Sequence, residues 1–402
     1  MNKNISNLYQ IAQKDSRKII GLMSGTSLDG LDIALCEISE SGANTGVKML
    51  EFETIPYSED IKIEIRKVFA KKNIDFEQLV VLNEWIGILH AEMINGALQK
   101  WNISANEVDL IASHGQTVLH APKFLHQLEK FPNATLQIGD GDHIAVKTGI
   151  ITLSDFRQKH IAAGGEGAPL AVYGDYFIFA KKGENRIMLN MGGIANFTYL
   201  PASVNPEETF VTDTGTGNTL IDLFVKHYFP EKNYDKDGEI AKKGTVNQTL
   251  LFHLKNHDFF RQNFPKTIGP ELFSYEYVAS AMLKSSQNNI AVEDLLATLT
   301  RFSAETIAEA IQLAIQNTAY KIEDFNIYMS GGGANNPLLV RWLKELLPCH
   351  FYKSDDLGIS SDAKEAVLFA ILANETIAGT GFNFGTKKGI PSVTMGKISL
   401  PD

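Results

Sequence analysis

Hydroxyls, carboxylates and glycines gather in the stretch 24-SGTSLDGLD-32, which joins two apolar runs that are typical of strands. The backbone at Gly25 and Gly30 is free to take positive φ angles and to come close to a ligand. A turn of this kind exposes a row of N–H groups that can cradle an anion. The alternative is an ordinary hairpin whose glycines serve only the turn.

Two more glycine turns follow strand-like runs further along the chain. Gly192–Gly193 lies between apolar runs in 186-RIMLNMGGIANFTYL-200, and 331–333 precedes a helical pattern capped near 335–336. The first of these repeats the opening hairpin, so we expect two similar halves that hold a ligand from both sides. Helix N-termini after glycine turns are anion sites, and the three turns together indicate a bound nucleotide.

The common nucleotide and metal fingerprints do not occur. The dinucleotide pattern Gly-x-Gly-x-x-Gly would need a glycine where Asn336 stands, and no acidic residue ends a strand about 20 residues later. The P-loop pattern is missing as well. Because the histidines and cysteines show no metal-ligand spacing, we expect no structural zinc.

Asp213 and Glu365 are the candidate catalytic carboxylates. Asp213 ends an apolar run and opens the turn Thr-Gly-Thr-Gly-Asn, where its side chain can take a proton from an attacking oxygen. An Asx-turn with its own glycines is the alternative. Glu365 begins the apolar helical pattern 362–375, where the alternative is an exposed acid that complements the helix dipole.

His114, Gln116 and Arg157 are the candidate substrate contacts. His114 and Gln116 follow a buried strand in 113-SHGQT-117, although a lone histidine there is more often a satisfied core residue. Arg157 ends 155-DFR-157 beside a glycine loop, where its guanidinium can fork onto a carboxylate or phosphate. A salt bridge between domains is the alternative for Arg157.

The composition is that of a folded globular enzyme. Of 402 residues, 44% are hydrophobic and 21% are charged, which excludes a disordered chain. A net charge of −10 without a basic block argues against nucleic-acid binding. Two cysteines, no signal peptide and no long apolar run predict a cytoplasmic protein that neither enters a membrane nor forms a disulfide framework.

The elements that position these residues alternate between strand and helix. Helical spacing covers 60–73 and 76–101, a strand follows at 107–115, and 135–157 continues as strand, turn, helix and strand. A chain of this length exceeds one core, so we expect two α/β domains. We place one in residues 1–148 with about 376–402, and the other in 149–375.

Taken together, these stretches resemble the anhydro-N-acetylmuramic acid kinase family of the actin, hexokinase and Hsp70 ATPase superfamily. The matching motifs follow in order over nearly the whole chain, and MSGTSLDG is the most specific of them. His160 and Glu166 depart from the family pattern, which usually has Asp and Gln there. The motifs are GLMSGTSLDGLD (21–32), SHGQT (113–117), LQIGDG (136–141), DFR (155–157), AAGGEGAPL (162–170), LNMGGIAN (189–196), DTGTGN (213–218), YDKDG (234–238), PKTIG (265–269) and SGGGANN (330–336).

The resemblance implies an actin-like, ribonuclease H-like fold with a nucleotide cleft between the domains. It implies that ATP, water and 1,6-anhydro-N-acetylmuramic acid give N-acetylmuramic acid 6-phosphate and ADP, in recycling of cell-wall sugar. Asp213 would activate the water, Glu365 matches a second acidic position, and Asp29 and Asp32 suit Mg²⁺. The implied nucleotide contacts are Gly25, Thr26, Ser27, Asp29, Gly30, Asp32, Gly192, Gly193, Asn196, Gly331, Gly332 and Gly333.

Two other functions remain open at this point. One is a plain sugar kinase that phosphorylates a free hydroxyl and uses no water. The other is an ATP-driven binding module of the actin or Hsp70 kind. Asp213 beside a small polar pocket favours an enzyme, and the resemblance implies that a small anhydro amino sugar is its substrate. A homodimer is compatible with the sequence.

Overall fold

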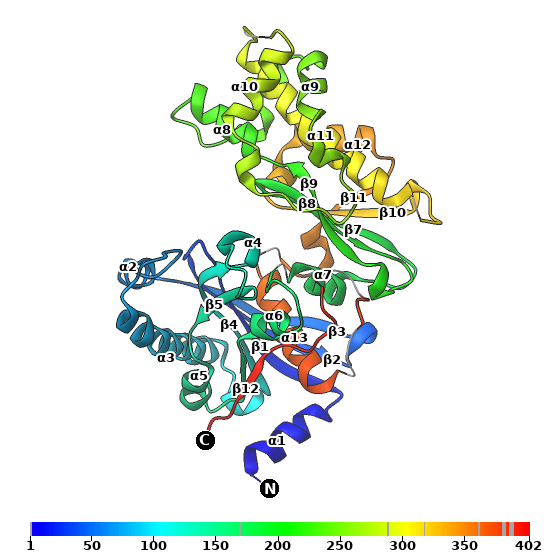
Figure 1. Cartoon of the computed structure of the whole chain (residues 1–402). Coiled ribbons are helices and arrows are strands. Elements are labelled where there is room, and N and C mark those ends of the chain that lie inside the picture. Colours follow the sequence, from blue (N-terminus) through cyan, green and yellow to red (C-terminus); the bar gives the residue numbers. More distant parts are fainter. Residues whose placement is uncertain are drawn as a thin grey trace. The chain divides into compact units, whose positions relative to one another are not determined.

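The computed structural model describes residues 2–168, 170–287, 289–316, 318–360, 362–379, 383–385 and 390–402. The chain forms two compact units (Figure 1). The first comprises Met1–Ile178 and Asp362–Asp402, and the second comprises Phe179–Ser361. Each unit contains its own sheet, helices and apolar core, so the expectation of two α/β domains is confirmed.

A seven-stranded sheet lies at the centre of the first unit. Six strands follow the order β12-β6-β4-β1-β2-β3, and β5 pairs with the later part of β4. β2 is antiparallel to β1 and β3, whereas β4 is parallel to both β1 and β6. The strands are β1 (Ser16–Ser24), β2 (Gly30–Ser39), β3 (Gly46–Pro56), β4 (Leu110–Ala121), β5 (Ala134–Ile138), β6 (Thr152–Ser154) and β12 (Lys397–Ser399).

Helices cover both faces of this sheet. Alternate residues of β1, such as Ile20 and Leu22, pack with Ile86 of α3 and Ile144 of α5. On the opposite face α13 packs against β1, β2 and β4. The helices are α1 (Lys3–Ala12), α2 (Glu59–Arg66), α3 (Phe76–Trp101), α4 (Lys123–His126), α5 (Gly141–Thr148), α6 (Phe156–Ala162), α7 (Ala171–Phe179) and α13 (Lys364–Ala378).

Gly21 sets how closely α13 approaches β1. A Cβ atom at this position would lie 1.9 Å from the backbone oxygen of Ala366, far inside van der Waals contact. Glycine inside a strand often marks a close backbone approach of this kind. The contact fixes the first turn of α13, and therefore Glu365, next to the strand that leads into the first glycine turn.

The second unit repeats the strand order of the first. Its five-stranded sheet has the order β11-β10-β7-β8-β9, with β8 antiparallel to its neighbours and β10 parallel to β7 and β11. Without β5 and β12, both sheets have the order 3-2-1-4-5, as the ribonuclease H-like fold requires. The strands are β7 (Asn185–Met191), β8 (Ile194–Leu200), β9 (Phe210–Thr216), β10 (Phe325–Ser330) and β11 (His350–Lys353).

One long helix forms most of the apolar cover of the second sheet. Ala304, Ile307 and Ile311 of α11 pack against Leu189 and Phe197. The N-cap of α12 is Asn336, whose side chain accepts the backbone N–H groups of two leucines, as the sequence predicted. The helices are α8 (Thr219–Tyr228), α9 (Gln248–Lys255), α10 (Tyr275–Lys284), α11 (Val292–Gln316) and α12 (Pro337–Leu346).

The boundaries between the units differ from those expected. The segments 149–178 and 362–375 lie in the first unit, whereas the sequence had assigned them to the second. β6 pairs in parallel with β4, and α13 packs against β1, so hydrogen bonding and burial attach both segments to the first sheet.

Both cysteines are free, as expected from their number and spacing. Burial raises the pKa of the Cys36 thiol and of the Cys349 thiol to about 12, so both are protonated at neutral pH. Among the described residues, no helix combines the length and the apolar character that crossing a bilayer requires.

Candidate active site

The turn between β1 and β2 presents unpaired backbone donors. The N–H of Leu28 is bonded to the carbonyl of Gly25, and the carbonyl of Asp29 accepts the N–H of Tyr57. Within the described part of the chain, no protein acceptor is found for the N–H groups of Thr26, Ser27 and Asp29, which belong to exposed residues. The turn therefore has the donors that an anion-binding loop needs.

A network of buried polar side chains anchors this turn to the first unit. The Oγ atom of Ser24, the last residue of β1, lies 2.5 Å from Oε1 of Gln116 and 2.8 Å from the hydroxyl of Tyr57. The amide nitrogen of Gln116 donates to the carbonyl of Gly25 at 3.2 Å. Tyr57 in turn contacts Nε2 of His90 at 2.7 Å. Gln116 is fully buried and anchors the turn, and its contact with substrate stays a prediction.

His114 is also a supporting residue in this structure. It is 2% exposed, and its Nδ1 lies 2.7 Å from the carbonyl of Gly115. Its Nε2 accepts the Nε–H of Arg157 at 2.8 Å. Burial, reinforced by the charge of Arg157, lowers the pKa of His114 to about 3. The imidazole is thus neutral with its proton on Nδ1, and it orients the guanidinium.

Arg157 keeps part of its guanidinium available. Its Nη1 donates to the carbonyl of Gly167 at 2.6 Å, while Nη2 has no partner among the described residues. Burial lowers the pKa of Arg157, and the negative charge of Glu365 partly offsets this shift. Because the pKa of an arginine lies far above neutral pH, the guanidinium stays charged. His160, one of the two departures from the family pattern, accepts the N–H of Gly167 at 2.9 Å and so shapes this loop.

Glu365 lies close enough to Arg157 and to Asp32 to interact with both through its charge. The side chain of Glu365 is exposed by surface area, but the protein atoms around its carboxyl raise its pKa above the usual value. The positive charges of Arg157 and Lys364 partly offset this rise, and the negative charge of Asp32 adds to it. Burial also raises the pKa of Asp32, and a 2.6 Å hydrogen bond from Thr54 opposes that shift. The first unit therefore gathers Asp32, Arg157 and Glu365 near the first glycine turn.

In the second unit, the glycine segments 192–193, 215–217 and 331–333 meet at the carboxyl ends of β7, β9 and β10. The carbonyls of Gly192 and Gly193 accept N–H groups from residues 217–219, and the Asn218 amide donates to the carbonyl of Met191. At 331–333, a Cβ on either outer glycine would lie within 2.8 Å of Met191 atoms. Close contacts of this kind leave no room for side chains, so both positions require glycine.

Polar side chains form one row across four strands beside these turns. In register, Ser330 pairs with Asn190, Asn190 with Asn196, and Asn196 with Asp213. Residues paired in this way share a face of the sheet. All four are partly exposed, whereas Leu189 and Phe197 in the next row are fully buried on the opposite face. Asn196 and Asp213, which the sequence proposed separately, are thus neighbours.

The Asp213 carboxylate is held by one oxygen only. Its Oδ2 accepts the backbone N–H of Ile268 at 2.8 Å, while Oδ1 has no hydrogen-bond partner in the described part of the chain. Burial raises the pKa of Asp213, and the Ile268 N–H partly offsets that rise. The predicted Asx-turn alternative is not seen, because this bond goes to a distant segment. Such a carboxylate can accept a proton through its free oxygen.

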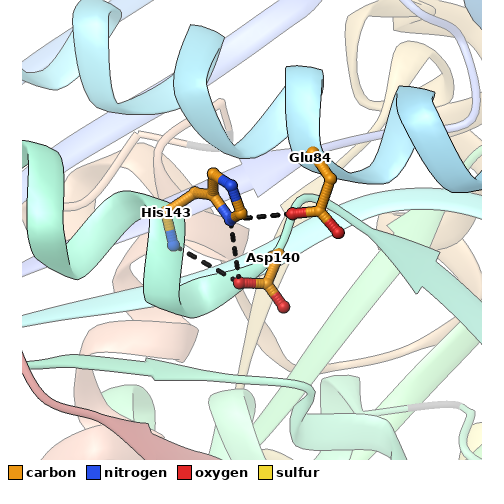
Figure 2. A group of neighbouring side chains, drawn as sticks. All are labelled: Glu84, Asp140 and His143. Carbon is orange, nitrogen blue, oxygen red and sulfur yellow. Dashed lines mark hydrogen bonds and ion pairs between the residues drawn. The ribbon is translucent and has the colours of Figure 1, made fainter.

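A carboxylate–histidine cluster lies elsewhere in the first unit (Figure 2). The Nδ1 of His143 lies 2.8 Å from Glu84 and 3.2 Å from Asp140, and Asp140 also caps α5. The three possible ligand atoms lie within 4.8 Å of one another. The contacts of His143 with both carboxylates connect α3 to α5. Mg²⁺ prefers oxygen ligands, so a histidine cluster does not suit it.

A polar cavity of about 360 Å³ also lies in the first unit, beside this cluster. Asp140, Asp142 and Asp155 line it, and its one lysine, Lys397, is paired with Asp155. Three carboxylates against one cation repel a polyphosphate. The glycine turns remain the better candidates for phosphate binding.

Comparison with known proteins assigns the chain to a family. The sequence model of anhydro-N-acetylmuramic acid kinase matches residues 17–398. The chain belongs to the anhydro-N-acetylmuramic acid kinase family. A kinase of that name from Pseudoalteromonas atlantica is 54% identical over the full length of both chains, and one from Caldanaerobacter subterraneus is 41% identical over 98% of this chain and 99% of its own.

Family membership confirms the resemblance drawn from the motifs. The match includes every motif on which that resemblance rests, from GLMSGTSLDGLD to SGGGANN. Among solved structures, an activator of 2-hydroxyisocaproyl-CoA dehydratase from Clostridium difficile aligns over 90% of this chain and 95% of its own, at 12% identity and a TM-score of 0.37. The enzyme class expected from the sequence, a phosphotransferase, is that of the family.

Proposed function

We propose that this member of the family converts 1,6-anhydro-N-acetylmuramic acid, water and ATP to N-acetylmuramic acid 6-phosphate and ADP. Water adds to the anomeric carbon, the bond from that carbon to the bridging oxygen breaks, and this oxygen takes the γ-phosphoryl group. The proton of the water passes to Asp213. The observation that carries the proposal is the free Oδ1 of a half-buried Asp213 beside the glycine turns.

The phosphates of ATP are assigned to the glycine turns. The exposed N–H groups of Thr26, Ser27 and Asp29 suit one set of phosphate oxygens. Gly192 and Gly193 suit a second, and the backbone of 331–333 suits the nucleoside. This assignment uses backbone donors in place of a P-loop lysine.

Asp29 and Asp32 are the proposed carboxylates for Mg²⁺. Mg²⁺ bound to phosphates usually takes only one or two protein carboxylates and keeps several waters. Asp29 is exposed and Asp32 is half-buried with one oxygen bonded to Thr54, so the pair fits such a partial ligand set. When bound, the ion would neutralise charge on the transferring phosphoryl group.

Arg157 and Glu365 are proposed to hold the sugar. The free Nη2 of Arg157 suits the lactyl carboxylate of the substrate, because planar guanidinium groups pair with carboxylates. Glu365 has a raised pKa and no hydrogen-bond partner in the described ranges, so it can contact a sugar hydroxyl. His114 supports the Arg157 guanidinium, whereas Gln116 supports the first glycine turn.

A labelling experiment tests the reaction. In ¹⁸O-water, we expect one label on the anomeric oxygen of the product and none on its phosphate, read by prompt mass spectrometry because the anomeric hydroxyl exchanges with solvent. If product that is quenched rapidly contains no label on its anomeric oxygen, the enzyme is a plain sugar kinase. Label that appears only in inorganic phosphate would indicate simple ATP hydrolysis, as in an ATP-driven binding module.

The first glycine turn gives a prediction for ATP binding. A Cβ at Gly25 would meet only the Ser27 hydroxyl at 3.6 Å, so Gly25→Val should fold and instead fill the space for phosphate. We expect the Kd of ATP, measured by calorimetry, to rise about tenfold or more. Gly96→Val on α3, where a Cβ also has open space, is the control. Equal ATP affinity in both variants would contradict the assignment.

Three further properties belong to this proposal. The enzyme acts on a small molecule, and we propose that it works in the cytoplasm without binding nucleic acid or membranes.

A homodimer is also proposed. Sedimentation at several protein concentrations would test the dimer, and a single species of monomer mass would contradict it.

A further inference from the structure

Lys266 is a buried lysine in the second unit that the reaction does not use directly. It is 7% exposed, and its Nζ donates to the carbonyls of Phe259 and Phe260 at 3.0 and 3.5 Å. The same ammonium lies 4.5, 5.9 and 5.3 Å from the ring centroids of Phe259, Phe260 and Phe264. Three aromatic faces and two carbonyls therefore form a cage around one cation.

The cage contains no counter-ion among the described residues. Every ion pair between a carboxylate and a cation in the described part of the chain involves a lysine other than Lys266, an arginine or a histidine. Burial accordingly lowers the pKa of Lys266. A buried ammonium is costly unless its donors are satisfied, so the carbonyls and rings must hold it in one place.

The backbone of Lys266 is bonded to the strand that carries Asp213. The N–H of Lys266 donates to the hydroxyl oxygen of Thr212 at 3.1 Å, and its carbonyl accepts the N–H of Asp213 at 2.9 Å. Two residues later, the N–H of Ile268 donates to Oδ2 of Asp213. One short segment thus pairs with β9 and also supplies the bond that orients the carboxylate.

We propose that Lys266 is a positioning residue for Asp213. Its caged ammonium fixes the segment 264–268 against η6 (Asp258–Arg261), and this keeps the Ile268 N–H on Oδ2 of Asp213 and leaves Oδ1 toward the substrate. The inference rests on the proposed role of Asp213 as the base. It adds a residue that contacts no substrate and acts through its neighbour.

Lys266→Met tests the cage, because methionine keeps the length and apolar character of the side chain but removes the ammonium. We expect kcat to fall about 10- to 100-fold with the KM of ATP nearly unchanged, since a small misplacement of a catalytic group costs up to about that much. Loss of the Ile268 N–H raises the pKa of Asp213, so the acid limb of the kcat profile should move to higher pH. Lys266→Arg can donate to the same carbonyls, so it should restore most of kcat and most of the position of the acid limb.

The matched control is Lys255→Met. Lys255 is also partly buried in the second unit, but it pairs with Glu305 and Glu309. A folded Lys266→Met variant with wild-type kcat and acid limb would overturn the proposal, as would an equal loss in Lys255→Met. If Lys266→Met does not fold, Ile268→Pro removes the N–H with Lys266 in place, and an unchanged acid limb there would also overturn it.

The outcomes separate this inference from the proposed function. Wild-type enzyme that gives no product would contradict the reaction itself, whereas Asp213→Asn with full turnover would contradict the role of Asp213 as the base, on which this inference rests. An active wild type and an inactive Asp213→Asn, together with a fully active Lys266→Met, would contradict only the positioning role.

Discussion

Replacing Asp213 by Asn should lower turnover about 10²- to 10⁴-fold while ATP and sugar still bind. Asparagine keeps the shape of the side chain and can still accept the Ile268 N–H through its carbonyl oxygen. It cannot take a proton from the attacking water, so only the chemical step is lost. Single-turnover kinetics and separate binding isotherms for the two substrates would measure the difference.

The pH dependence of turnover follows from the same carboxylate. Burial raises the pKa of Asp213 above its ordinary value, and the base must be deprotonated to act. Turnover should therefore fall as the pH drops through this raised pKa, at a higher pH than for an ordinary aspartate. The acid limb should be absent from the residual activity of Asp213→Asn.

Asp294→Asn is the matched control for this experiment. Asp294 is also partly exposed in the second unit, and its carboxylate also accepts one backbone N–H, from Thr245 at 2.7 Å. We expect that variant to keep normal turnover. Near-normal turnover in Asp213→Asn would remove this residue from the mechanism and transfer the role of base to Glu365.

Much of the fold could be predicted because each local signal agrees with its neighbours. The apolar runs around 24–32 and 186–200 became the hairpins β1–β2 and β7–β8, and helical spacing at 76–101 became α3. Asn336 caps α12 where the glycine turn ends. Period and turn chemistry are local properties, so a single sequence contains them.

The domain boundaries could not be predicted, because they depend on pairing between distant segments. β6 is only three residues long, and its place beside β4 rests on hydrogen bonds that no local pattern encodes. α13 joins the first unit because Gly21 lets it approach β1 closely. A glycine inside an apolar strand was the one signal available for that contact.

The roles of polar residues were harder to predict than their places. His114 and Gln116 lie beside the first glycine turn as expected, but burial and hydrogen bonds make them supports for Arg157 and Gly25. Spacing places a residue near a site without showing which atoms are already satisfied. Lys266 lies within the matched motif PKTIG, yet nothing in the sequence indicated that three phenylalanines surround it.

Arg157→Ala should raise the KM of the sugar about 10- to 100-fold and change the KM of ATP far less. The variant loses a charge-assisted hydrogen bond to the lactyl carboxylate, which contributes about 1.5–3 kcal/mol. His114 and Gly167 already hold the Nε and Nη1 groups, so little ordering is needed for Nη2 to meet a carboxylate. Steady-state kinetics with each substrate varied in turn would separate the two effects.

Arg17 supplies the control because it is buried in the same unit and also donates to backbone carbonyls, those of Lys14 and Glu40. Arg17→Ala should lower the melting temperature without a selective change in the KM of the sugar. Arg157→Lys keeps the charge but lacks the planar fork, so it should recover only part of the affinity. A sugar analogue without the lactyl carboxylate should bind wild type and Arg157→Ala equally. If Arg157→Ala raises both KM values alike, or lowers only the melting temperature, then Arg157 supports the fold and another cation must hold the carboxylate.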